Sequence, residues 1–100
     1  MKSYPIRLTA EAETDLLNIY NYIFSQSGSQ QRATHFTIRI TQFMAKLETF
    51  PERGTVRSDI RPGLRIVGVN RSVTLAFEVE DQEVIVHRIL YHGQSISIDK

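Results

Sequence analysis

The hydrophobic residues follow two different periods along the chain, and the change falls near Pro51. Before that proline, apolar residues recur every three or four positions, which is typical of one face of an α-helix. After it, apolar and polar residues alternate, which is typical of β-strands. Two helical stripes result: Ala12, Leu16, Ile19, Tyr20 and Ile23, then Ala33, Phe36, Ile40, Phe43, Met44 and Leu47.

Polar residues mark where these two helices begin and end. Thr9 predicts the N-cap of the first helix, and acidic residues follow it where the helix dipole favours negative charge, at Glu11, Glu13 and Asp15. The segment from Ser25 to Ser29 predicts the end of this helix and the start of the next. The second helix stops by Thr49, because the proline two residues later disfavours helical geometry before it. A short polar link between amphipathic helices predicts an antiparallel helical hairpin.

Four strands are predicted around this hairpin. Tyr4 to Leu8 forms a short first strand, and Leu64 to Val69 forms another after the helices. Ser72 to Val79 alternates cleanly, with Val73, Leu75, Phe77 and Val79 on one face. Glu83 to Tyr91 is apolar on both faces, which is typical of a central strand. Tight turns are predicted at Asn70-Arg71 and Glu80-Asp81-Gln82.

The order of these elements predicts an α+β fold with two layers. An N-terminal strand leads into the helical hairpin, and a three-stranded antiparallel meander follows. We expect the hairpin to cover one face of the sheet and the first strand to lie beside the last. The length favours a single domain over residues 1–100. Apolar residues off the main helical stripe, at Leu17, Tyr22 and Phe24, indicate a protein partner or packing against a neighbouring segment.

Composition narrows the function classes. The chain has 100 residues, 41% of them hydrophobic, and no cysteine. These values exclude wholesale disorder, a disulfide scaffold, cysteine-ligated zinc and thiol catalysis. It has no apolar run long enough to span a membrane and no signal-peptide core at its start. We therefore expect a cytoplasmic protein without a membrane partner.

The net charge of +1 hides an uneven distribution. Between Arg53 and Arg71 there are five arginines and one aspartate, whereas Glu78 to Glu83 holds four acidic residues. Such a basic stretch attracts nucleic acid or an acidic partner, or is a solvated loop and edge strand. The acidic residues are interpreted as a solvated hairpin tip, because catalytic carboxylates need a cleft.

Few residues suggest chemistry. His35, His87 and His92 have no metal-ligand spacing, so no metal or cofactor is expected. Arg88 interrupts the apolar last strand, and strict alternation places it on one face with Val84 and Val86. A charge inside a central strand needs a carboxylate or an anionic ligand. Either Glu78 on the neighbouring strand pairs with Arg88, or Arg88 faces an anionic surface.

Several segments together resemble the ParE toxins of the RelE/ParE superfamily. They are Leu8–Leu16, Phe50–Gly54, Ile60–Arg65, Thr74–Val79 and Val84–Gln94. No single motif is decisive, but their order and spacing are specific, and the resemblance covers nearly the whole chain. It implies a toxin of a bacterial type II toxin–antitoxin system, neutralised by a cognate antitoxin. Operator DNA would be contacted only indirectly, through the antitoxin.

The resemblance also separates two branches. ParE-like members are associated with inhibition of DNA gyrase, whereas RelE-like members cleave mRNA on the ribosome. Where RelE-like toxins carry catalytic arginines, this chain has Thr74 and Gln94. Without those cations little would stabilise the developing charge of RNA cleavage. The chain also departs from the ParE pattern at Glu78, often basic, and at Ser95, often aspartate.

The sequence therefore favours a binding inhibitor over an enzyme. The expected residues for contact with the target or the antitoxin are Arg65, Arg71, Arg88, His92 and Gln94. Two alternatives stay open: a ribosome-dependent mRNA endonuclease, with His87, Tyr91 and His92 as acid–base groups, and a non-toxic binding module that kept the fold.

Overall fold

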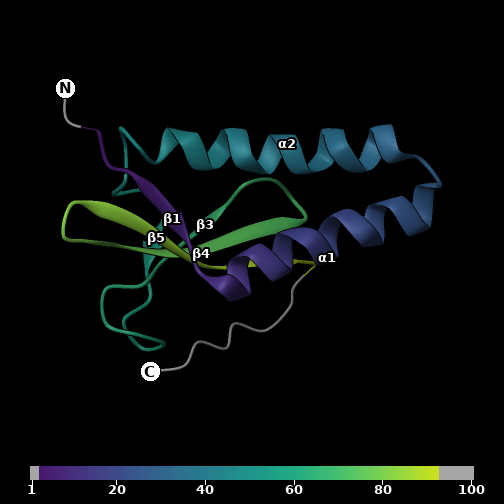
Figure 1. Cartoon of the computed structure of the whole chain (residues 1–100). Helices are drawn as coiled ribbons and strands as arrows, with labels where there is room; N and C mark the ends of the chain where they lie inside the picture. The colour runs from purple at the N-terminus through teal and green to yellow at the C-terminus, as the bar shows by residue number, and fades with distance from the viewer. Residues whose placement is uncertain (1–2, 93–100) are drawn as a thin grey trace.

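The computed structural model describes residues 3–92 and shows a helical hairpin packed on a five-stranded sheet (Figure 1). Strand β1 (Ile6–Leu8) leads into helices α1 (Ala10–Ser27) and α2 (Gln30–Lys46). Strands β2 (Thr55–Val56), β3 (Arg65–Gly68), β4 (Val73–Glu80) and β5 (Glu83–Tyr91) follow. The strand order across the sheet is β1-β5-β4-β3-β2. This arrangement confirms the predicted α+β fold class.

The pairing of the strands agrees with the prediction at both ends of the chain. Strand β1 runs parallel to β5, with Ile6 opposite Val84 and Leu8 opposite Val86. Strands β3, β4 and β5 form the antiparallel meander, so β5 is central, as its two apolar faces indicated. The two-residue edge strand β2 was not predicted, because a pair of residues is too short to show alternation.

The predicted caps hold the hairpin in place. The Thr9 side chain accepts a hydrogen bond from the N–H of Ala12 at 3.1 Å, as an N-cap does. Gly28 adopts a left-handed conformation at the end of α1, where a side chain would be disfavoured. Ser29 then caps α2 by accepting from the N–H of Arg32 at 3.1 Å. The two caps are consecutive residues, and this short connection sets the antiparallel course of the helices.

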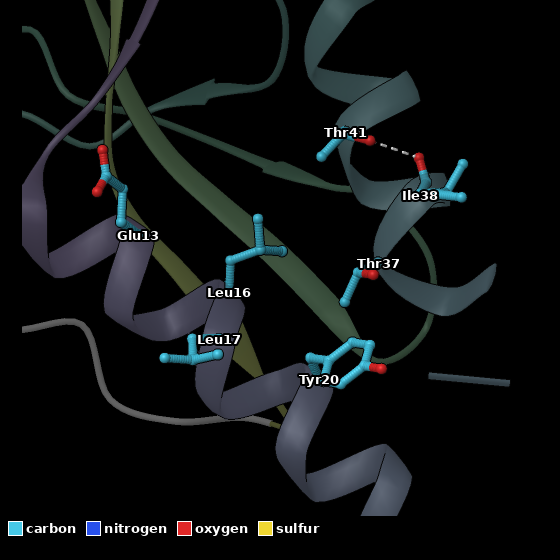
Figure 2. A pocket seen from close by; sticks show the side chains of 7 residues that line it. All are labelled: Glu13, Leu16, Leu17, Tyr20, Thr37, Ile38 and Thr41. Atoms are coloured by element: carbon cyan, nitrogen blue, oxygen red, sulfur yellow. Dashed lines mark hydrogen bonds between the residues drawn. The ribbon is translucent and has the colours of Figure 1, made fainter. Parts of the chain in front are cut away.

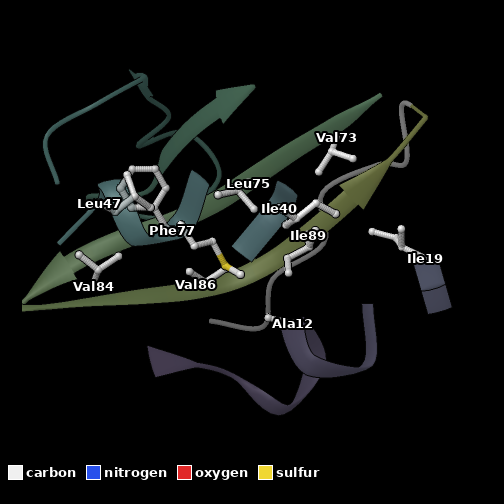
Figure 3. Close-up of a cluster of buried hydrophobic side chains, with 11 residues drawn as sticks. Ala12, Ile19, Ile40, Leu47, Val73, Leu75, Phe77, Val84, Val86 and Ile89 are labelled. Carbon is white, nitrogen blue, oxygen red and sulfur yellow. The ribbon is translucent and has the colours of Figure 1, made fainter. Parts of the chain in front are cut away.

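The hydrophobic core lies between the hairpin and one face of the sheet (Figure 3). Phe77 and Leu75 of β4 are fully buried, and Ile40 of α2 and Leu47 at its C-cap pack in the same cluster. The other buried members are Ala12, Ile19, Met44, Val73, Val84, Val86 and Ile89. Full burial of each large aliphatic or aromatic side chain contributes about 1.5–3 kcal/mol. This cluster is the main force that holds the hairpin on the sheet.

A β-bulge in β5 overturns the predicted face of Arg88. Val86 lies opposite Phe77, whereas Arg88 lies opposite Ala76, so His87 is an extra residue in the ladder. Strict alternation had placed Arg88 with Val84 and Val86, which face the core. The bulge instead turns Arg88 to the open face, the face of the sheet away from the helices. Ile89 consequently faces the core with Val84 and Val86.

Glycine is required where the loop before β2 passes β3. Gly54 has a φ of +80°, and a Cβ atom there would clash with the backbone carbonyl of Ile66. Gly63 has the same φ of +80°, but a Cβ atom there would meet nothing within 4 Å. The two glycines thus share one backbone conformation and differ only in the space around them.

We therefore predict that Gly54→Ala lowers the free energy of unfolding much more than Gly63→Ala. The left-handed conformation costs a residue with a Cβ atom about 1–2 kcal/mol at either site. The clash at Gly54 adds about 1–3 kcal/mol. Urea unfolding of both variants measures the difference. Equal losses would show that Gly54 has no steric role against β3.

Candidate functional site

The carboxylate of Asp15 joins α1 to β5 near the middle of the molecule. It accepts hydrogen bonds from Arg88 Nε at 2.7 Å and from Arg88 Nη2 at 3.0 Å. It also accepts from the backbone N–H of Ile89 at 2.9 Å. The side chains of Arg88 and Asp15 are only 18% and 11% exposed, so the pair is largely shielded from water. The hydrogen bonds that Arg88 donates to Asp15 raise the pKa of Arg88 above its ordinary value, against the effect of burial.

This pair decides between the two interpretations of Arg88. The arginine has a carboxylate partner, as a charge in a central strand requires. The prediction that Glu78 pairs with Arg88 was wrong. The bulge turns Arg88 away from the core, and α1 places Asp15 beside it instead. Asp15 had been assigned only a role in the helix dipole. The sequence carried no signal that it would face β5.

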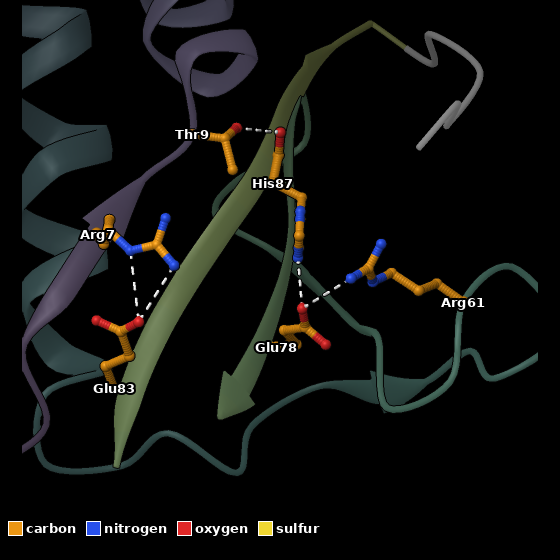
Figure 4. Close-up of polar contacts among 6 residues, drawn as sticks. All are labelled: Arg7, Thr9, Arg61, Glu78, Glu83 and His87. Atoms are coloured by element: carbon orange, nitrogen blue, oxygen red, sulfur yellow. Dashed lines mark hydrogen bonds and ion pairs between the residues drawn. The ribbon is translucent and has the colours of Figure 1, made fainter. Parts of the chain in front are cut away.

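Glu78 instead forms a cluster with His87 and Arg61 on the open face (Figure 4). Its Oε1 atom lies 2.8 Å from His87 Nε2 and 3.5 Å from Arg61 Nη2. Glu78 is 8% exposed, and among the described residues it is the one charged residue that is buried. The bulge turns His87 toward the same face as Glu78, and Thr9 Oγ1 donates to the carbonyl of His87 at 3.0 Å. The Glu78 carboxylate is thus contacted by an imidazole on one side and by a guanidinium on the other.

A hollow of about 400 Å³ lies where the end of β5 meets α1. Its lining consists of Asp15, Asn18, Ile19, Tyr22, Tyr91 and His92. The ring of Tyr91 makes edge contacts with Tyr22 at 5.5 Å and with Phe36 at 5.8 Å between centroids. Burial raises the pKa of the Tyr91 hydroxyl above its ordinary value. The hollow therefore presents aromatic and amide groups beside a carboxylate that is already paired.

An apolar groove runs between the two helices on the outer side of the hairpin (Figure 2). Its volume is about 370 Å³, and its walls come from both helices. Leu17 and Ile38 are 59% and 45% exposed, which is high for large aliphatic side chains. The remaining lining residues are Glu13, Leu16, Tyr20, Thr37 and Thr41. Of the three apolar residues noted off the helical stripe, Leu17 lines this groove, whereas the Tyr22 ring contacts Tyr91 and the Phe24 ring contacts Tyr20.

The predicted contact residues fall into separate places. Arg88 and His92 lie on either side of Asp15, and His92 donates its N–H to the carbonyl of Ser72, next to Arg71. Arg71 is exposed in the β3–β4 turn. Arg65 lies apart, opposite Phe77 and therefore on the helix side of the sheet, with its Nη1 atom 3.5 Å from the carbonyl of Arg53. Gln94 lies outside the described residues.

Within residues 3–92, no group of three histidine or acidic side chains is placed to hold a metal ion. Neither helix is long and apolar enough to cross a lipid bilayer.

Solved structures share this fold. A chain of the chromosomal ParDE system from P. aeruginosa matches with a TM-score of 0.77 and 23% identity, over 89% of this chain and 96% of that one. The RelBE2 toxin–antitoxin complex from Mycobacterium tuberculosis matches with a TM-score of 0.61 and 17% identity, over 89% of this chain and 98% of that one. The YoeB-YefM complex from Staphylococcus aureus matches with a TM-score of 0.58 and 18% identity, over 89% of this chain and 97% of that one. The fold is therefore that of the RelE/ParE toxins.

The family follows from the sequence itself. The family model described as the ParE toxin of the type II toxin–antitoxin system parDE matches residues 6–96. The chain belongs to this family, as its segments suggested, and is a toxin-type protein of the RelE/ParE superfamily. No match was found among curated proteins.

The contacts of Asp15 yield a stability prediction. Asp15→Ala leaves a shielded guanidinium and the N–H of Ile89 without their acceptor, so we expect it to lower the free energy of unfolding by about 2–4 kcal/mol. Arg88→Met in the Asp15→Ala background should recover part of that loss, because the isolated charge is gone. Urea unfolding of the two single variants and the double variant gives the coupling energy. Additive losses would mean that the two side chains act independently.

Proposed function

We propose that this protein is a toxin that stops growth by binding and inhibiting DNA gyrase in the cytoplasm, and that a cognate antitoxin neutralises it. Membership of the ParE family supports the toxin class. The observation that carries the choice of mechanism is the state of the arginines on the open face. Arg88 is paired with Asp15, and Arg61 is paired with Glu78.

RNA cleavage needs positive charge that is available to the reacting phosphate. On the open face of this sheet a carboxylate already engages each of those two arginines, and uncharged Thr74 lies on β4 opposite Leu90. His87 is likewise occupied by Glu78 at 2.8 Å. A binding inhibitor needs none of these groups to be free. The geometry therefore favours inhibition by binding over a nuclease of the RelE type.

The contact surface for the target is proposed to include Arg71 and His92, which are both exposed and lie close together at one end of the sheet. Arg65 and Arg88 are also part of the proposed contact set. Arg65 lies beside the loop before β2, and Arg88 is held by Asp15. Gln94 completes the proposed set from the sequence.

Controlled expression of the chain in bacteria separates the proposed function from its alternatives. We expect growth to stop, plasmid supercoiling to change and messages to stay intact. Arg71→Glu with His92→Ala should restore most of the growth. Fragmented mRNA with normal supercoiling would favour the endonuclease, and unimpaired growth would favour a non-toxic binding module.

The antitoxin is proposed to lay an amphipathic helix in the groove between α1 and α2. The groove supplies the apolar walls that such a helix needs, with Leu17 and Ile38 as its most exposed members. Among the similar solved structures, RelBE2 is a toxin–antitoxin complex and the ParDE chain comes from a toxin–antitoxin system. We therefore expect this chain, as a member of the ParE family, to have an antitoxin partner.

Leu17→Glu should weaken neutralisation and leave toxicity in place, because it puts a charge into the apolar groove. We expect at least a tenfold weaker complex with the antitoxin, which corresponds to about 1.4 kcal/mol or more. Val56→Glu is the matched control, since Val56 is 49% exposed and lies on β2, away from the groove. Calorimetric titration of both variants with the antitoxin encoded beside the toxin measures the effect. Equal weakening by the two variants would remove the groove from the proposal.

A further inference from the structure

Helix α2 carries a line of positive charge along one side. Arg32, Arg39 and Lys46 are spaced by seven residues, or nearly two helical turns, so they lie on one side of the helix. All three are exposed, and the line is about 21 Å long at 1.5 Å per residue. Helix α2 contains no acidic residue, whereas α1 contains Glu11, Glu13 and Asp15 and no basic one. The two helices of the hairpin therefore carry opposite charge.

This line lies on the side of α2 opposite to the apolar groove. Thr41 lines the groove, and Arg39 is two residues away, which is about 200° around the helix at 3.6 residues per turn. The exposed aliphatic side chains Leu17 and Ile38 are thus on one flank of the hairpin and the cations on the other. The two flanks suit partners of different chemistry.

The positive surface continues past the end of α2. The guanidinium of Arg53 lies 5.9 Å from the ring centroid of Phe43 and 5.6 Å from that of Phe50. Lys46 Nζ lies 5.7 Å from the same Phe43 ring. Arg65 reaches the carbonyl of Arg53 from β3 at 3.5 Å. We call this surface the cationic flank; its members are Arg32, Arg39, Lys46, Arg53 and Arg65.

The cations of this flank are available to a partner. None of the five forms an ion pair with a residue in the described range 3–92, in contrast to Arg7, Arg57, Arg61 and Arg88. The nearest acidic residues along the chain are Glu48 and Glu52, beyond the end of α2. The 21 Å line along α2 therefore carries three exposed cations without an ion-pair partner among the described residues.

We propose that the cationic flank binds the phosphate backbone of a nucleic acid. Along α2 this flank offers cations and no exposed large hydrophobic side chain among the described residues, whereas Phe50 and Val56 are exposed beside Arg53 and Arg65 at its far end. Phosphates are what a row of cations recognises without reading sequence. A protein partner would need apolar area, which the hairpin presents on its other flank. This proposal differs from the expectation that the toxin meets operator DNA only through its antitoxin. It shares Arg65 with the proposed contact set, but its test changes only Arg32 and Arg39, so it can fail or succeed separately from the proposed function.

Fluorescence anisotropy tests the proposal with the purified chain and three labelled probes: a 20-base-pair DNA duplex, single-stranded DNA and single-stranded RNA. The Arg32→Gln/Arg39→Gln variant should bind at least tenfold more weakly at low salt. The slope of log K against log salt should fall by about 2 for the duplex, since each phosphate contact contributes about 0.9. The comparison among probes tells which nucleic acid provides the phosphates.

The matched control is Arg7→Gln/Arg57→Gln, which removes the same charge from two exposed arginines elsewhere. It should change the affinity less than twofold, and thermal unfolding should show both double variants folded. Equal loss in the control, or no binding of any probe by the wild-type chain at low salt, would overturn the proposal. So would stronger binding of poly-glutamate than of every nucleic acid, which would point to an acidic protein instead.

Discussion

The position of the helical hairpin on the sheet depends on the carboxylate of Asp15. Strand β1 pairs with β5 only as far as Val86, so the rest of that edge of β5 has no neighbouring strand. Asp15 supplies an acceptor for the N–H of Ile89 where β1 has ended, and its charge holds Arg88. Together with Thr9, which bonds to Val86 and His87, it fastens the first turns of α1 to the edge of β5. The groove, the hollow beside Tyr91 and the cationic flank are all placed by that attachment.

The open face of the sheet and the exposed side of α2 differ in whether their charged side chains are paired. On the open face of the sheet, arginines and a histidine are matched with carboxylates at Asp15 and Glu78. Along α2, the cations are left without such partners among the described residues. A paired and shielded cation stabilises the fold or a fixed geometry, whereas an exposed, unpaired one is suited to binding. This contrast separates the parts of the molecule that hold its shape from those that are offered to partners.

Much of the fold could be predicted because local signals agreed with the tertiary structure. Thr9 and Ser29 cap the helices where the sequence placed them, and the alternation of β4 holds throughout its length. The bulge could not be predicted, because His87 looks like any other residue in an alternating strand. Because this extra residue was missed, Arg88 was predicted on the wrong face of the sheet and with the wrong carboxylate partner. The need for a carboxylate was right, since it rests on the cost of an unpaired charge and not on register. Asp15 was missed because its contact joins residues 73 positions apart.

The bulge also limits how this strand can be compared with its relatives. A bulge adds one residue to one strand and none to its partner. A relative without it would reach the end of β5 one residue sooner, and each position after Val86 would face the other side of the sheet. An alignment that places letters of β5 in columns without a gap would then equate core residues with open-face residues. Motifs drawn from the part of this strand after Val86 therefore carry meaning only when the extra residue at His87 has been located first.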